Sequence, residues 1–88
     1  MLIEKTKNKR EEIENVLSDL DMDEVAVFKS GDEAVIVFAV WSQGVRSYIL
    51  LTNTARDIYI YQDLVEFLKE KDFGFVYCKP YEDLDIYY

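Results

Sequence analysis

Three aspartates at alternating positions, Asp19, Asp21 and Asp23, are the first residues along the chain whose spacing could do chemistry. This one-three-five spacing begins an EF-hand calcium loop, in which carboxylate oxygens coordinate the ion. The sixth position of such a loop is glycine and the twelfth a bidentate glutamate, but here they are Glu24 and Ser30. The pattern therefore predicts a solvated acidic connection and no calcium site.

A single cysteine and the absence of histidine restrict other chemistry. Without histidine the chain has neither the usual general base near neutral pH nor the commonest zinc ligand. Cys78 has no second cysteine to pair with, and although Lys79 could lower its pKa, we interpret it as a buried, inert thiol. The sequence therefore predicts no catalytic residue, no metal site and no cofactor.

Carboxylates from separate segments leave one enzymatic alternative open. A small nuclease-like enzyme could gather acids such as Glu14, Asp32 and Asp57 around a divalent cation, because magnesium prefers oxygen ligands. These residues share no local motif, so only their arrangement in the folded chain can support this alternative.

The charge balance indicates the class of partner. Eighteen acids against ten bases give a net charge of −8, which repels nucleic acid and membrane surfaces. We therefore expect no direct binding of nucleic acid or membrane, and a basic protein as partner.

The basic start of the chain is followed by Glu11 and Glu12 and not by the apolar segment of a secretory signal, so we expect a cytoplasmic protein.

Acidic side chains near tyrosines are the candidate partner-binding residues. Such a surface could mimic nucleic-acid phosphates and occupy the basic groove of a partner, and tyrosine is favoured at interfaces. The plainer interpretation of the same charge is solubility. The residues expected to bind a partner are Asp19, Asp21, Asp23, Glu82, Asp83, Asp85, Tyr87 and Tyr88.

These observations predict a non-enzymatic, acidic protein–protein interaction module. The expected form is an inhibitor or nucleic-acid mimic of the kind that mobile elements and viruses encode, acting on a basic, nucleic-acid-handling partner. The alternatives are a catalytically inactive or divergent nuclease-like domain and a structural subunit of a homo-oligomer.

The elements that position these residues surround one apolar run, Ala34–Trp41, which is bounded by turn residues and is too short to cross a membrane. Helices are expected from an N-cap at Asn8 to Leu20 and from an N-cap at Asp63 to a stop at Gly74. The expected strands are residues 24–29, 34–41, 46–52 and 75–78, with residues 58–61 ambiguous between a strand and the lead-in to the second helix.

This order, α-β-β-β-α-β, predicts one small α+β domain over residues 1–88, with a three-stranded antiparallel meander, a C-terminal strand, two helices, and flexible ends at 1–7 and 81–88. Both alternating faces of the strands are apolar, so both must be covered. Either each helix covers one face, or a homodimer buries one of them.

The order of elements resembles the core of the restriction-endonuclease-like nucleases, a family that includes archaeal Holliday-junction resolvases. In that family an acid on the second strand and an acid-x-lysine on the third hold magnesium. Here the second strand, Ala34–Trp41, is apolar, and the third ends in Leu51, Thr52 and Asn53. The resemblance covers topology without the motif, so it implies an inactive relative and no metal site.

Overall fold

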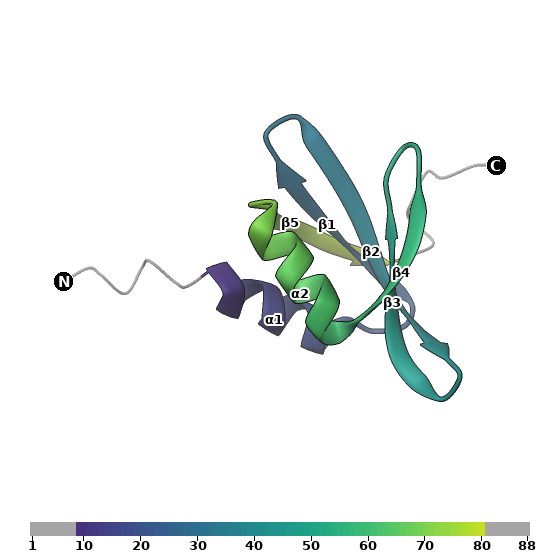
Figure 1. Ribbon diagram of the computed structural model, residues 1–88. Coiled ribbons are helices and arrows are strands. Elements are labelled where there is room, and N and C mark those ends of the chain that lie inside the picture. Colours follow the sequence, from purple (N-terminus) through teal and green to yellow (C-terminus); the bar gives the residue numbers. More distant parts are fainter. Residues whose placement is uncertain (1–8, 81–88) are drawn as a thin grey trace.

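The computed structural model describes residues 9–80, which form two helices and five strands (Figure 1). The predicted α+β class is confirmed, with one strand more than expected. The ends predicted to be flexible, and the predicted cap residue Asn8, lie outside the described residues. The elements are α1 Lys9–Asp19, β1 Glu24–Ser30, β2 Glu33–Ser42, β3 Val45–Leu51, β4 Arg56–Ile60, α2 Tyr61–Glu70 and β5 Gly74–Pro80.

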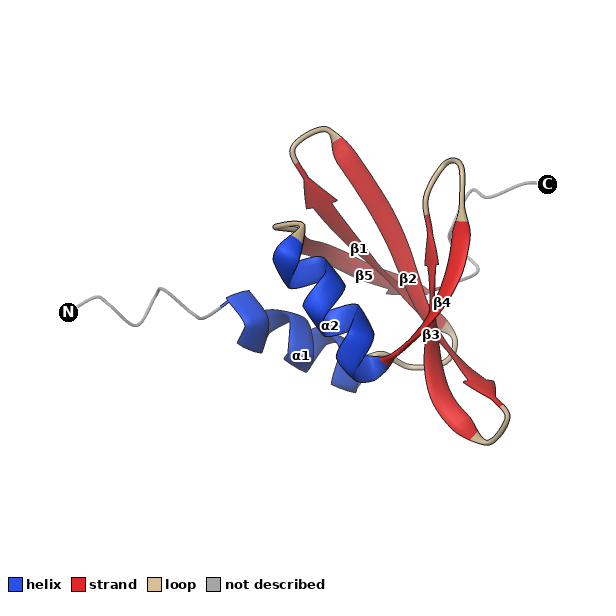
Figure 2. Ribbon diagram, in the orientation of Figure 1, coloured by secondary structure: helices blue, strands red, loops and turns tan. Residues whose placement is uncertain are grey.

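All five strands belong to one antiparallel sheet in the order β4-β3-β2-β1-β5 (Figure 2). The segment around Ile58, which the sequence left ambiguous, is the edge strand β4, and α2 follows it directly. At the opposite edge β5 pairs with β1, and the register shifts by a bulge between Val27 and Phe28. The meander thus continues through β4, and the last strand returns beside the first.

Two tight turns fix the register of the central strands. Gly31 opens the two-residue β1–β2 turn with φ +62°, as the first position of a type II′ turn requires. Gln43 and Gly44 in the β2–β3 turn have φ values of 54° and 78°, and two positive φ values in sequence are typical of a type I′ turn.

Both helices lie on the same side of the sheet, side by side (Figures 1 and 2). Of the two expected arrangements, the one in which each helix covers one face was therefore wrong. Ion pairs help hold the helices together, since Arg10 in α1 contacts Glu66 in α2. Lys9 also contacts Asp72, just beyond α2, at 2.8 Å. The helices form one layer and the sheet another.

The core lies between these two layers. Alternate residues of the central strands, including Phe28, Val37 and Tyr48, are buried against Leu17 of α1 and Leu68 of α2. The ring of Phe28 meets that of Phe75 edge-on, with centroids 5.8 Å apart. Close packing of large apolar side chains on this face supplies the main stabilising term of the fold.

The ends of α2 differ from the expected caps. The helix begins at Tyr61 after Ile60, which makes no side-chain capping bond, so the expected N-cap at Asp63 was wrong; this residue lies in the first turn. The helix stops before Gly74, because Asp72 takes the left-handed conformation with φ 61°. Its N–H donates to the Lys69 carbonyl, and the Phe73 N–H donates to the Leu68 carbonyl, the pattern of a Schellman motif.

Candidate protein-interaction surfaces

The residues Asp19, Asp21, Asp23 and Glu24 gather at the connection between α1 and β1, and we call this group the acidic corner. The three aspartates are exposed. None of them joins an ion pair within residues 9–80, whose salt bridges all involve Lys9 or Arg10. The structure thus brings together the first three predicted partner-binding residues, and no cation in the described part of the chain pairs with them.

Hydrogen bonds fix the shape of this corner. The Glu24 N–H donates to the Asp21 carbonyl at 3.1 Å, and the Asp21 N–H donates to the Glu24 carboxylate at 3.2 Å. These two bonds close the turn on itself. The carboxylates are therefore held on a defined turn, as a surface that binds by preorganised charge requires.

Arg46 on β3 anchors the end of α1 from below the corner. Its guanidinium donates to the carbonyls of Leu20 and Leu17, and its Nε donates to the Tyr48 hydroxyl at 3.0 Å. The Tyr48 hydroxyl in turn donates to the Leu17 carbonyl at 3.0 Å. The last turn of α1 contains no basic residue, so these contacts from β3 satisfy carbonyls that the helix leaves without partners.

A shallow pocket of about 430 Å³ opens beside the acidic corner, and Cys78 forms part of its wall. The thiol is exposed, so the expectation that it is buried was wrong. Partial burial, together with the Glu24 carboxylate, raises the pKa of Cys78. Lys79 does not lower this pKa, because its ammonium lies over the Tyr77 ring, on the opposite side of the strand. The lining residues are Asn15, Val16, Asp19, Asp21, Glu24 and Cys78.

The acids considered for an enzymatic site lie on three separate elements. Glu14 lies on α1 and accepts a hydrogen bond from Arg10, Asp32 lies in the β1–β2 turn, and Asp57 lies on the edge strand β4. Within residues 9–80 no three side chains of histidine, cysteine, aspartate or glutamate are grouped so that they could hold a metal ion. The other predicted partner-binding residues, Glu82, Asp83, Asp85, Tyr87 and Tyr88, lie outside the described residues.

A second surface, which the sequence did not assign, is the side of the sheet opposite the helices; we call it the open face. Strand register defines it, because residues directly paired across antiparallel strands point to the same side. Two rows of side chains cross all five strands. The first row is Lys79, Val25, Phe38, Ile49 and Ile58, and the second is Tyr77, Val27, Ile36, Leu51 and Arg56.

The open face is apolar with a cationic rim. Its charged residues, within the described strands, are Lys29, Arg56 and Lys79, and the register places no acid on this side. That is notable in a chain with a net charge of −8. Alternation of polar and apolar residues could not reveal this face, since both sides of β2 are apolar. The signal in the sequence was that Val25, Val27 and Lys29 occupy alternate positions, which places a lysine on the same side of the strand as two valines.

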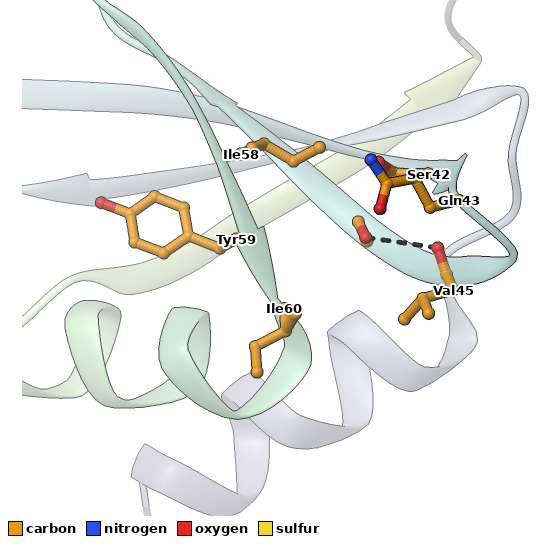
Figure 3. A pocket seen from close by; sticks show the side chains of 7 residues that line it. Ser42, Gln43, Val45, Ile58, Tyr59 and Ile60 are labelled. Carbon is orange, nitrogen blue, oxygen red and sulfur yellow. Dashed lines mark hydrogen bonds between the residues drawn. The ribbon is translucent and has the colours of Figure 1, made fainter.

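A pocket of about 300 Å³ opens where the β2–β3 turn approaches β4 (Figure 3). Val45, Ile58 and Ile60 supply apolar walls. The Ser47 hydroxyl donates to the Val45 carbonyl at 3.2 Å, so the polar group at this position is satisfied internally. Among the described residues no charged side chain lines the pocket, which therefore extends the apolar character of the open face. Its other lining residues are Ser42, Gln43, Ser47 and Tyr59.

Comparisons with protein-family models, with curated proteins and with solved structures found no match for this chain. Among the described residues, neither helix is long and apolar enough to cross a membrane.

Proposed function

We propose that this protein is a non-enzymatic binding module whose acidic corner captures a basic protein partner. The observation that carries the proposal is the set of three exposed aspartates, Asp19, Asp21 and Asp23, at the end of α1 and on the hydrogen-bonded turn after it, none of them in an ion pair within residues 9–80. Carboxylates in this state attract a cationic surface at long range and form ion pairs on contact.

The partner is a nucleic-acid-handling protein whose basic groove normally receives phosphates, and the acidic corner acts as an inhibitor by occupying that groove. This mechanism is of the kind that mobile elements and viruses encode. If it holds, double-stranded DNA and the protein compete for the same site on the partner. If the partner binds DNA and the protein at the same time, the protein associates with the partner electrostatically but does not inhibit it.

Matched charge variants test whether the corner itself binds. The test variant carries Asp19→Asn, Asp21→Asn and Asp23→Asn, and the control carries Asp32→Asn, Glu33→Gln and Asp57→Asn, near turns at the other end of the sheet. Each variant changes the net charge equally, from −8 to −5, by removing three acids.

Binding to immobilised polylysine at fixed salt is the measurement. An exposed ion pair contributes about 0.2–1 kcal/mol, and the corner variant loses three carboxylates. It should therefore bind roughly three- to hundredfold more weakly than the unsubstituted protein. The control variant should lose much less. Equal losses in the two variants would mean that net charge alone drives binding and would refute a role for the corner.

A further inference from the structure

We propose that the open face is a docking surface and that its occupant is the segment 81–88 of the same chain, Tyr-Glu-Asp-Leu-Asp-Ile-Tyr-Tyr. This segment combines three acids with five large apolar or aromatic residues. The open face offers the matching chemistry, an apolar centre with lysine and arginine at its rim.

Burial on the open face is uneven, and its buried part lies over β1. Val25 and Val27 lie on this face and outside the core cluster that the helices cover, yet their exposed fractions are 0% and 8%. Ile58 and Ile60, on the same face at the β4 edge, remain 56% and 51% exposed. A sheet face without a second layer leaves its side chains substantially exposed, so the two valines indicate cover above β1.

Charge directs the segment toward this face. Pro80 pairs with Glu24, so the chain leaves β5 beside the acidic corner, which lies on the helix side of the sheet. Like charges there repel Glu82, Asp83 and Asp85, whereas Lys79 on the open face attracts them. The cations Lys29, Arg56 and Lys79 thus favour an acidic occupant over a second copy of the same cationic face.

Length and residue pattern also fit. Eight residues span at most about 26 Å when extended, and five strands at their usual spacing are about 19 Å across, so the segment can reach β4. In an extended chain, alternate side chains point the same way. Leu84, Ile86 and Tyr88 would then face the sheet together with Glu82, which lies nearest to the Lys79 edge, and Asp83 and Asp85 would point toward solvent.

Nuclear Overhauser contacts in the full chain test this inference directly. We expect contacts from the methyl groups of Leu84 and Ile86 to those of Ile36 and Ile49. A 1:1 mixture of isotope-labelled and unlabelled chains, recorded with an isotope filter, should show none of these contacts. Their absence from the fully labelled sample would overturn the proposal, and their presence in the filtered mixture would assign the occupant to a second copy.

A pair of charge reversals tests the electrostatic part. Lys79→Glu should reduce the docked population about two- to fivefold, the effect of losing one exposed ion pair, and shift the Ile86 methyl resonance toward its value in a free peptide. Lys71→Glu, which makes the same charge change beyond the end of α2, should leave the resonance in place. Equal shifts in both variants, or none in either, would contradict a role for Lys79.

The docking surface and the acidic corner are on opposite sides of the sheet. A failed contact measurement therefore leaves capture of a basic partner untouched, and a failed capture experiment leaves the docked segment untouched.

Discussion

Arg46 joins β3 to the end of α1, and replacing it with methionine is predicted to destabilise the fold substantially. Methionine keeps the apolar stem but removes the guanidinium donors to the carbonyls of Leu17 and Leu20 and to the Tyr48 hydroxyl. The guanidinium also lies 5.5 Å from the centroid of the Tyr48 ring. The substitution therefore tests whether this one side chain holds the two layers together beneath the acidic corner.

The size of the effect follows from these contacts. A hydrogen bond from a charged donor contributes about 1.5–3 kcal/mol, a cation–π contact about 0.5–1 kcal/mol, and a cation at a helix C-terminus about 0.3–1 kcal/mol. Because Arg46 is only partly buried, we take values near the lower ends. Arg46→Met should lower the free energy of unfolding by about 2–3 kcal/mol.

Urea unfolding measures this loss. With a slope near 1 kcal/mol per molar urea, the midpoint should fall by about 2–3 M with the slope unchanged. Arg46→Lys keeps the charge but not the forked donors, so it should lose about half as much. Arg56→Met, at the exposed edge, should stay within about 0.5 kcal/mol of the unsubstituted protein. A loss below about 0.5 kcal/mol for Arg46→Met, or equal losses for the methionine and lysine variants, would refute this reasoning.

Three further predictions follow from single residues. Asp72→Gly should raise the free energy of unfolding by about 0.5–1 kcal/mol in chemical denaturation, because glycine adopts the left-handed conformation without strain. A loss of stability would mean that the lost ion pair with Lys9 outweighs the relieved strain. Cys78 should react with a thiol reagent at pH 7 more slowly than in the unfolded chain, since its raised pKa keeps it protonated, and a faster reaction would contradict this. The hydrogen bond from Arg10 lowers the pKa of Glu66, so the stabilisation is present above the unfolded pKa and is lost as the pH falls through the lowered folded value. Glu66→Gln should therefore be less stable than the unsubstituted protein at pH 7, and the two stabilities should converge in acid. A stability difference that persists in acid would contradict this origin.

The sequence was sufficient to predict the elements that have strong local signals. The apolar run of β2, the turn at Gly44 and the stripe of Ile13 and Leu17 on α1 each follow from local residue pattern and turn chemistry. The edge strand around Ile58 was ambiguous because it is short and runs directly into α2, so no turn residue separates the two elements.

The placement of the helices could not be predicted from the sequence. Val35 and Val37 face the helices whereas Ile36 and Phe38 face away, and the two sets are equally hydrophobic. Only packing in three dimensions decides which set the helices cover. The cationic rim was likewise hidden, because a bulge in β5 decides on which side Lys79 lies.

The candidate site was predicted in part. Asp19, Asp21 and Asp23 could be nominated from their charge and spacing, but the absence of an ion pair to them within residues 9–80 depends on where the lysines and arginines of that part fold. Arg46, which contacts the end of α1 from the sheet, uses its donors on the carbonyls of Leu17 and Leu20.

The salt dependence of capture is the decisive measurement of whether the protein functions through the exposed carboxylates of the acidic corner. Binding of the full chain to a basic protein should weaken linearly in log K against log salt concentration, and the slope should be shallower for the variant that lacks Asp19, Asp21 and Asp23. An association constant that does not change with ionic strength, or a slope that the three substitutions leave unaltered, would contradict the account.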